Sequence, residues 1–294
     1  MPATTLADRT LVEVSGPEAE HFLQTIITTD LDTLESGVAR AGALLTPQGK
    51  ILFDFVVSRA GPERFRLDCR ADAADDLVKR LTLYKLRAKV EIAKNDQAVV
   101  SVSWETDSTG SHADSAASRD ESDAVADGRF VDRDDVRRHY GAAPGGDDAD
   151  AWQRLRIAHA VAESGADFAL GEAFPHDVLY DRNGGVGLKK GCFVGQEVVS
   201  RMQHRGTARR RLAIAGGAAA LPAAGSPVTA GGRAIGTLGT VAGADALALV
   251  RIDRAAAAMQ AGTPIEADGV AVTLALPAWS GLAFAAGETD TEAG

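Results

Sequence analysis

The sequence predicts a mixed α/β region followed by a small all-β domain. Helix-like and strand-like patterns alternate over the first hundred residues, whereas the chain from Arg211 onward has many glycines, short strand patterns and no long helix pattern. At about 150 residues per domain, the 294 residues are enough for about two domains. We therefore expect an α+β fold that ends in a small β-barrel or sandwich.

Two helices are expected in the first hundred residues. Ser15 and Glu18 have the spacing of a capping box, and apolar residues follow at helical spacing, which predicts a helix over 16–28. A second helix places four apolar side chains on one face, and these are Leu77, Val78, Leu81 and Tyr84.

Three strands are expected beside these helices. A run of β-branched and aromatic residues over 51–57 follows a turn signal, and its alternation places Asp54 opposite the large apolar side chains. The runs 65–69 and 90–93 indicate two more strands, the first with Cys69 facing inward. Because free cysteine is among the most buried residue types, we interpret Cys69 as a packing residue.

The middle of the chain contains an acidic stretch. Residues 106–128 carry six acids, one arginine and almost no large apolar side chain, so they cannot bury enough surface to offset the entropy of ordering. We predict a flexible insertion, with a docking segment as the alternative. Helices are expected over 151–163 and from about Gly195, followed by strands at 228–230, 234–241, 246–252 and 270–276.

Composition excludes several classes of protein. With only two cysteines, the chain cannot by itself build a four-thiolate zinc or iron–sulfur site, and low cysteine content suits a reducing compartment. The net charge of -10 argues against a protein that coats nucleic acid. The N-terminal residues lack the pattern of a secretory signal, and no apolar stretch is suited to a membrane. We therefore expect a cytoplasmic protein with no metal site of its own.

A cysteine-containing loop is the most distinctive local feature. Cys192 follows Lys189 and Lys190 and comes just before the helix expected from Gly195. Adjacent cations and a helix N-terminus both favour the thiolate over the thiol. The alternative is a buried cysteine in a turn with solvated lysines.

The string KGCFVGQE, from Lys190 to Glu197, resembles the YgfZ-type folate-binding proteins, relatives of the glycine-cleavage T-protein (aminomethyltransferase). The resemblance extends to VSGPEAEHFLQTIITTDL, LLTPQGKILFDF, RIAHAVAESGADFALGEAFPHD, HRGTARRRL and LALPAWSG. It implies an α+β, T-protein-like fold with two interleaved α/β modules around a central channel and a C-terminal β-barrel. It also implies tetrahydrofolate as cofactor and a role in the assembly or repair of iron–sulfur enzymes, with iron–sulfur client or assembly proteins as partners.

The resemblance assigns expected roles to seven positions. Cys192 is the key thiolate and Lys190 lowers its pKa, while Gln196 and Glu197 shape the loop. Asp54 is a candidate for the pterin, whose 2-amino group and ring N–H can donate to one carboxylate. Its alternative is a carboxylate on a solvated strand face. The cations for the glutamate tail are Lys190, Arg201 and Arg205, and we expect Asp54 and Cys192 to share one cavity.

A folate-dependent transferase is a second candidate function, and a departure from the T-protein pattern bears on it. Where T-proteins carry a pterin-binding glutamate, in an LRLE string, this chain has Ala158, which weakens a folate-dependent aminomethyl or one-carbon transferase. Further departures from the YgfZ-type pattern are Ala160, Ala162 and Phe193.

A basic string, Arg205 with 209–211, allows a tRNA-modification partner, although the arginines can instead be solvated, paired between domains or bound to the folate tail. We expect the folate-binding region to cover 1–208, the barrel 209–285 and a tail 286–294.

Overall fold

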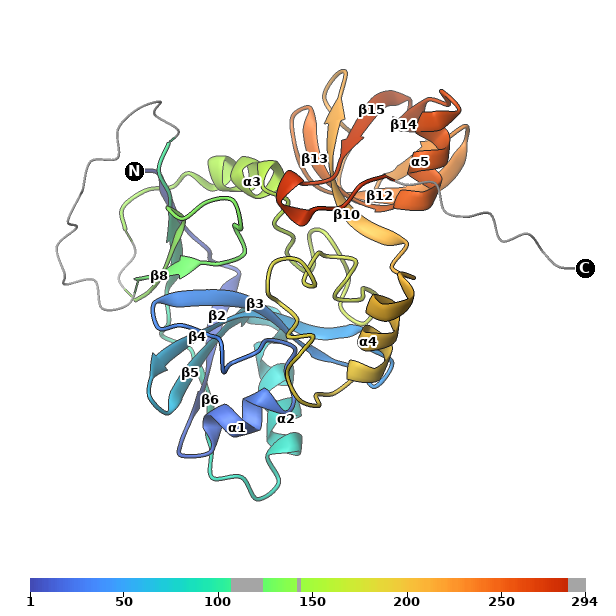
Figure 1. Ribbon diagram of the computed structural model, residues 1–294. Helices are drawn as coiled ribbons and strands as arrows, with labels where there is room; N and C mark the ends of the chain where they lie inside the picture. The colour runs from blue at the N-terminus through green and yellow to red at the C-terminus, as the bar shows by residue number, and fades with distance from the viewer. Residues whose placement is uncertain (107–123, 142–143, 285–294) are drawn as a thin grey trace, which may run out of the picture. The chain divides into compact units, whose positions relative to one another are not determined.

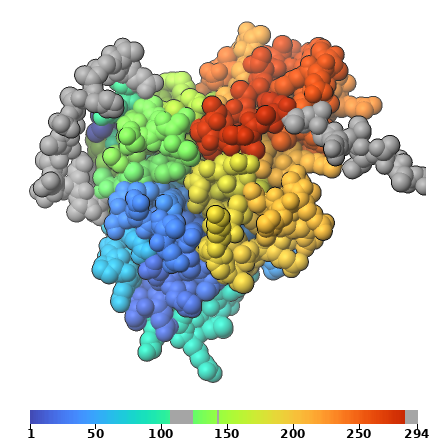
Figure 2. Space-filling view, viewed as in Figure 1, coloured from blue at the N-terminus to red at the C-terminus, as the bar shows by residue number. Residues whose placement is uncertain are grey.

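The computed structural model describes residues 1–106, 124–141 and 144–284. Contacts divide the chain into two compact units, each made from two separate stretches of sequence. Unit 1 contains Met1–Trp152 and Tyr180–Val198, and unit 2 contains Gln153–Leu179 and Val199–Gly294. Figure 1 traces the elements of each unit, and Figure 2 shows the surface on the same side. Among the described residues, no helix is both long and apolar enough to cross a membrane.

Unit 1 is built on one sheet, in which nine strands are described. One antiparallel half has the order β3-β4-β5-β2-β6 and the other has the order β1-β7-β9-β8, and a short parallel pairing of β3 with β8 joins them. The chain starts in the second half, builds the first, and returns to the second, which is the interleaving that the T-protein resemblance implies. The strands are β1 (Ala3–Thr5), β2 (Arg9–Ser15), β3 (Val38–Leu45), β4 (Ile51–Gly61), β5 (Arg64–Arg70), β6 (Glu91–Asn95), β7 (Val100–Ser103), β8 (Ala124–Asp127) and β9 (Arg137–Tyr140).

One face of this sheet packs on two helices, α1 (Ala19–Gln24) and α2 (Ala74–Lys85). The alternation predicted for β4 is confirmed, because Phe53, Phe55 and Val57 lie in the core with Leu77 and Leu81 of α2. Cys69 of β5 lies in the same core and is 1% exposed, which confirms it as a packing residue. Burial raises the pKa of its thiol to about 12.

Helix α1 is shorter than the helix predicted over 16–28, and the predicted capping box is wrong. Ser15 is the last residue of β2, where it pairs with both neighbouring strands and cannot begin a helix. The Glu18 carboxylate accepts a hydrogen bond from the Lys89 backbone N–H at 2.6 Å instead of closing the box. Tertiary pairing thus overrides a local signal that had the correct spacing.

The opposite face of the sheet carries a buried network of charges. Asp68 of β5 accepts hydrogen bonds from Arg9 and Arg138, and Asp127 of β8 accepts from Arg138 and Arg129. The side chains are at most 4% exposed. We name these five residues the ion network. Burial alone would raise the pKa of the Asp127 carboxyl, but the charges and hydrogen bonds of Arg129 and Arg138 outweigh it and hold that pKa well below its usual range.

The ion network shows that this face is concave. Arg138 of β9 reaches Asp68 of β5 although β8, β3 and β4 lie between them in the sheet. Four strand spacings would separate the two strands by about 19 Å in a flat sheet, which is more than the two side chains can bridge. The sheet must therefore curl, and the small residues Ala39 and Ala41 of β3 leave room beneath the guanidinium.

The prediction of a flexible segment over 106–128 is wrong at its C-terminal end. Residues Ala124–Asp127 form β8 within the sheet, and Asp127 is 2% exposed. The stretch has almost no large apolar side chains, but ion pairs with two arginines stabilise the buried Asp127 carboxylate, which composition alone does not reveal. Residues 107–123 lie outside the described part of the chain.

Unit 2 contains a closed barrel with the order β10-β13-β12-β11-β14-β15, which confirms the predicted C-terminal β-barrel. Closure leaves no open sheet edge. The sequence missed α5 (Ile252–Gln260), an alanine-rich helix whose Ala255, Ala256 and Ala258 are buried. The strands are β10 (Arg210–Gly217), β11 (Pro227–Ala230), β12 (Arg233–Ala242), β13 (Asp245–Arg251), β14 (Ile265–Ala267) and β15 (Val270–Ala275).

The stretch 153–179 of unit 2 is fixed by a second buried arginine. Helix α3 (Ala149–Ala158) ends earlier than the predicted residue 163. In the last turn of this helix, Arg156 donates to the Val161 carbonyl at 2.9 Å, the Asp167 carboxylate at 2.8 Å and the Thr240 hydroxyl of β12 at 2.8 Å. Asp167 also accepts from the Thr240 N–H at 2.7 Å, so this stretch is hydrogen-bonded to the barrel.

Candidate functional site

The KGCFVGQE string lies in the stretch of chain that returns to unit 1. We name residues 185–198 the thiol strap. The Thr28 hydroxyl donates to the Gly185 carbonyl at 2.7 Å and accepts from the Ala43 N–H at 2.9 Å. The Gly187 N–H donates to the Thr28 carbonyl at 2.8 Å. One buried threonine therefore ties the strap to strand β3.

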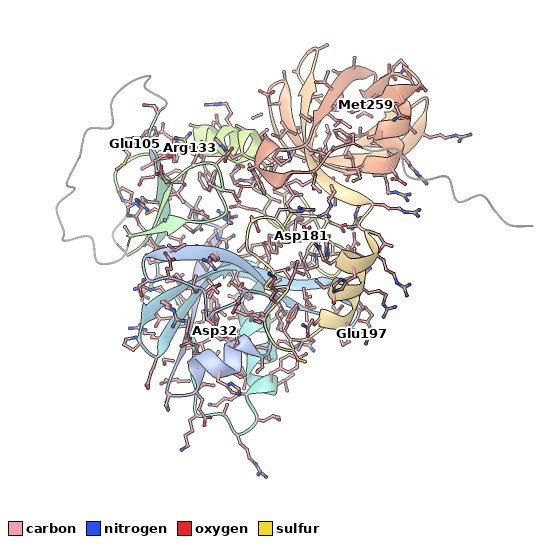
Figure 3. The ribbon with its side chains drawn as sticks, viewed as in Figure 1. Asp32, Glu105, Arg133, Asp181, Glu197 and Met259 are labelled. Atoms are coloured by element: carbon pink, nitrogen blue, oxygen red, sulfur yellow. The ribbon has the colours of Figure 1, made fainter. Side chains whose placement is uncertain are left out.

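Lys190 is a second anchor of the thiol strap. Its ammonium Nζ donates to the Ile27 carbonyl at 2.9 Å and the Thr29 carbonyl at 2.6 Å. It also lies 5.5 Å from the ring centroid of Phe193. Burial lowers the pKa of the Lys190 amine to about 8, although the carboxylates of Asp30 and Asp32 (Figure 3) oppose the shift. Its predicted influence on the Cys192 thiol stays a prediction.

We expect Lys190 to make stability depend on pH in the alkaline range. Its folded pKa of about 8 lies below the ordinary 10.5, so the folded state disfavours the charged amine. This unfavourable contribution is complete below pH 8 and disappears as the pH rises toward 10.5. The unfolding free energy of the wild type, relative to Lys190→Met, should therefore rise between these values in urea titrations. A difference that stays flat over this pH range would contradict the low pKa.

Two glycines interlock the thiol strap with the turn before β4. Gly195 has φ +78° and Gly49 has φ +79°, a region that residues with a side chain rarely adopt. A Cβ on Gly195 would lie 2.5 Å from the Thr46 carbonyl oxygen, and one on Gly49 would lie 2.9 Å from Cβ of Val198. The strings LLTPQGK and KGCFVGQE are therefore packed against each other. This close contact explains why the first has a glycine at position 49 and the second at position 195.

Cys192 is exposed on the anchored strap, so the alternative of a buried cysteine in a turn is wrong. Helix α4 (Gln196–Arg205) begins four residues later, as predicted. Gln196 is half-buried and donates its backbone N–H to the Phe193 carbonyl at 3.2 Å, while Glu197 (Figure 3) is exposed on the first turn. The strap thus presents one thiol from a backbone held on both sides.

The two cysteines should differ sharply in reactivity. In the native protein we expect Ellman's reagent to modify Cys192 quickly and to leave Cys69 unmodified, because Cys69 is buried and its pKa is raised to about 12. One thiol per chain should therefore titrate under native conditions, and both in concentrated guanidinium chloride. Rapid reaction of both thiols in the native protein would contradict the buried position of Cys69.

Asp54 lies on the concave face of unit 1, opposite the helices. It is 8% exposed and pairs in register with Ala43, so the alternative of a solvated strand face is wrong. Arg201 and Arg205 are exposed on α4. A pterin contact at Asp54, tail contacts at both arginines and a cavity shared by Asp54 and Cys192 stay predictions.

The basic string that suggested RNA contact is partly used within unit 2. Arg210 forms an ion pair with Asp177 at 2.6 Å, and Arg211 is 5% exposed and donates to the His176 carbonyl at 2.6 Å. Two of the four arginines therefore bind the chain itself. Fewer of these arginines are therefore available to contact RNA than the sequence suggests.

A cavity of about 410 Å³ lies on the barrel between α5 and the β11–β12 hairpin. Its rim carries Arg233 and Arg254, and Ile235 and Ala258 line its apolar part. The residues predicted from sequence are not among its lining. The transferase alternative also gains nothing from the structure, since Ala158 is the last residue of α3 and offers no carboxylate.

Sequence reasoning missed the residues that hold the site together. Thr28 and Gly49 lie in strings that were noticed, but a threonine or glycine in a string does not reveal its partner far along the chain. Asp68 alternates with apolar neighbours in its strand, which predicts an exposed face rather than a buried ion pair. Arg138 lies between Arg137 and His139, a polar run that gives no sign of burial. One signal was available: Asp68, like Asp54, lies on the strand face opposite the apolar core residues, so both carboxylates could have been assigned to one face of the sheet.

Two family models match the chain. Residues 7–103 match the GCVT N-terminal domain, and residues 209–282 match the CAF17 C-terminal beta-barrel domain. The mouse protein named "Iron-sulfur cluster assembly factor IBA57, mitochondrial" is 30% identical over 302 residues, covering 93% of this chain and 84% of the mouse protein. The chain belongs to the YgfZ-type (CAF17/IBA57) family. The predicted family is thereby confirmed.

Other IBA57 relatives are covered less completely. The human protein of the same name is 30% identical over 232 residues, which are 70% of this chain and 64% of the human protein. The homolog from Neurospora crassa is 29% identical over 228 residues, 71% of this chain and 52% of that protein. The chain thus spans about half the length of such fungal relatives. The predicted cytoplasmic location is contradicted, because these IBA57 proteins are named as mitochondrial.

A solved structure confirms the fold. The glycine cleavage system aminomethyltransferase T from Bartonella henselae superposes with a TM-score of 0.66, covering 97% of this chain and 86% of that one. At 16% identity this likeness shows the T-protein-like fold alone.

Proposed function

We propose that this chain is a tetrahydrofolate-binding accessory protein that supports the assembly or repair of iron–sulfur enzymes, with Cys192 as its key residue. The observation that carries the proposal is an exposed thiol on a strap anchored by Thr28, Lys190 and Gly195. The names of the IBA57 relatives support the same process.

The number of cysteines limits how many ligands this chain can give to an iron–sulfur cluster. Iron–sulfur clusters are held mainly by cysteine thiolates, usually four. This chain has two cysteines, and Cys69 lies in the core with its pKa raised to about 12. Cys192 can therefore supply one ligand, and a cluster received or passed on here needs its other ligands from a partner protein.

The folate half of the proposal depends on Asp54. Its carboxylate is buried on a concave strand face beside the small residues Ala41 and Ala43, which is suited to accept two hydrogen bonds from a flat ring edge. Bound folate would supply one-carbon or redox chemistry. The chain's own contribution is to hold the pterin edge at Asp54, with Lys190 and Gln196 keeping the strap in place.

Two variants separate the halves of the proposal. Cys192→Ala should fail to restore iron–sulfur enzyme activity in a deletion strain, yet should still bind tetrahydrofolate in calorimetry. Asp54→Asn should lose folate binding while Ellman's reagent still modifies Cys192. Full restoration by Cys192→Ala would remove the proposed role of the thiol. Absence of both heat and thermal stabilisation at about 1 mM tetrahydrofolate would remove the folate.

A further inference from the structure

Unit 1 exposes two leucines that its core does not use. Leu83 is 70% exposed and Leu86 is 88% exposed, whereas Leu77 and Leu81 of the same helix are buried. Leu83 lies in the last turn of α2, and Leu86 is the residue that directly follows the helix. In Figure 2, residues of this part of unit 1, in teal, protrude at the bottom of the view.

Exposed cations flank the two leucines in the sequence. Lys79, Arg80, Arg87 and Lys89 are exposed, and the stretch 79–89 contains no acid in a chain of net charge -10. We name these four residues with Leu83 and Leu86 the basic–leucine patch. A helix dipole favours cations in the last turn, but Arg87 and Lys89 lie beyond the end of α2.

The cations of the patch are available to another molecule. Lys79 pairs with Asp76 at 3.0 Å, but both side chains are at least 70% exposed, so the pair is weak. Among the residues that the structure describes, no side-chain partner is found for Arg80, Arg87 or Lys89. Folding alone therefore does not account for their charges.

The backbone of Leu86 supports the same conclusion. Leu86 caps α2 with φ 47° and ψ -105°, a strained conformation for a residue with a side chain and one where glycine is the usual choice. A leucine that is 88% exposed gains almost nothing from packing to offset this cost. A contact with another molecule would account for the leucine, because strained residues cluster at functional places.

We propose that the basic–leucine patch is a docking surface for an acidic segment of a partner protein that offers an apolar pocket. An apolar centre within a polar rim is the usual anatomy of a protein interface, and the charge of the rim selects an acidic partner. An anionic lipid surface fits less well. Asp72, just before α2, and Asp75 and Asp76, in its first turn, are exposed, and a chain of net charge -10 is repelled by anionic headgroups. This surface does not depend on the proposed folate or cluster function.

A photo-crosslinking amino acid at Leu83 of the full chain, in living cells, identifies what lies on the patch. Met259 on α5 (Figure 3), which is 40% exposed, is the matched control position in unit 2. We expect a protein adduct at Leu83 that is absent at Met259. No adduct beyond the control, or binding to phosphatidylglycerol-containing vesicles that Leu83→Ser abolishes, would overturn the proposal.

The crosslinked protein is then purified and titrated calorimetrically against variants. Arg80→Glu with Arg87→Glu should weaken its binding at least about tenfold, because like charges then face each other. Leu86→Gly should weaken binding without lowering the unfolding free energy, since glycine relieves the strained φ. The control Arg233→Glu with Arg254→Glu makes the same charge change on the barrel and should leave the affinity unchanged. An affinity unchanged in the Arg80/Arg87 variant, or reduced equally in the barrel control, would refute the docking surface.

Discussion

Replacing Arg138 by methionine should lower the unfolding free energy of unit 1 by about 3–5 kcal/mol. Its guanidinium is fully buried and hydrogen-bonds Asp68 at 2.8 Å and Asp127 at 3.0 Å. The substitution leaves two carboxylates and two guanidiniums in a site that excludes water, with fewer hydrogen bonds to each carboxylate. Guanidinium chloride unfolding followed by tryptophan fluorescence measures the change, because Trp104 and Trp152 belong to unit 1.

The exposed pair of Arg64 with Glu13 is the matched control for this prediction. The Arg64 side chain is 51% exposed, so Arg64→Met should cost less than about 1 kcal/mol. A change within 1 kcal/mol for Arg138→Met as well would show that the ion network contributes little to stability.

Acid titration provides a second readout of the network. The pKa of the Asp127 carboxyl is held below the ordinary 3.8, so its stabilising contribution is complete above that pH and is lost progressively on further acidification. The destabilisation by Arg138→Met should therefore diminish as the pH falls below about 3.8. If the difference in unfolding free energy between the wild type and Arg138→Met does not depend on pH, the loss of stability comes from packing rather than from charge pairing.

Gly195→Ala should detach the thiol strap and abolish support of iron–sulfur enzymes. The positive φ costs a residue with a side chain roughly 1–2 kcal/mol, and overlap of the new Cβ with the Thr46 carbonyl adds about 1–3 kcal/mol. The strap can relieve this only by leaving the turn at Thr46–Gly49. Hydrogen exchange of strap amides, together with complementation of a deletion strain, measures both effects.

Gly191→Ala in the same strap is the matched control. Gly191 does not have a positive φ, and a Cβ there would meet no atom within 4 Å, although it lies beside Cys192. This variant should keep the exchange protection and activity of the wild type. Loss of activity in Gly191→Ala, or wild-type hydrogen exchange of the strap amides in Gly195→Ala, would contradict the claim that activity depends on the packing of Gly195 against Gly49.

Local patterns in the sequence predicted much of this fold. The alternation along β4 gave the correct core face because Phe53, Phe55 and Val57 all point into one cluster. Four of the six barrel strands, β11, β12, β13 and β15, were predicted because turn residues bound them. Strands β10 and β14 were not predicted, and α5 was missed because alanine carries little periodic signal.

Long-range pairing explains the remaining errors. The capping-box signal at Ser15 was overridden by pairing with two strands, and β8 was missed because Asp127 depends on arginines that follow it in the sequence. At the site, spacing and family resemblance predicted roles for Cys192 and Asp54, and these roles stay predictions. The anchors at Thr28 and Gly49 depend on contacts made across more than a hundred residues, which no local pattern records.

The division of unit 1 between Met1–Trp152 and Tyr180–Val198 has a consequence for synthesis on the ribosome. The sheet can start to fold once its strands have emerged, but it stays incomplete until the strap that anchors Lys190 has followed. Residues Gln153–Leu179 meanwhile lack their partners until β10 and β12 have been synthesised. Arg210 of β10 pairs with Asp177, and Thr240 of β12 accepts a hydrogen bond from Arg156. A fragment that stops at residue 208 would leave those acceptors and donors without their barrel partners, so the two units are expected to mature together.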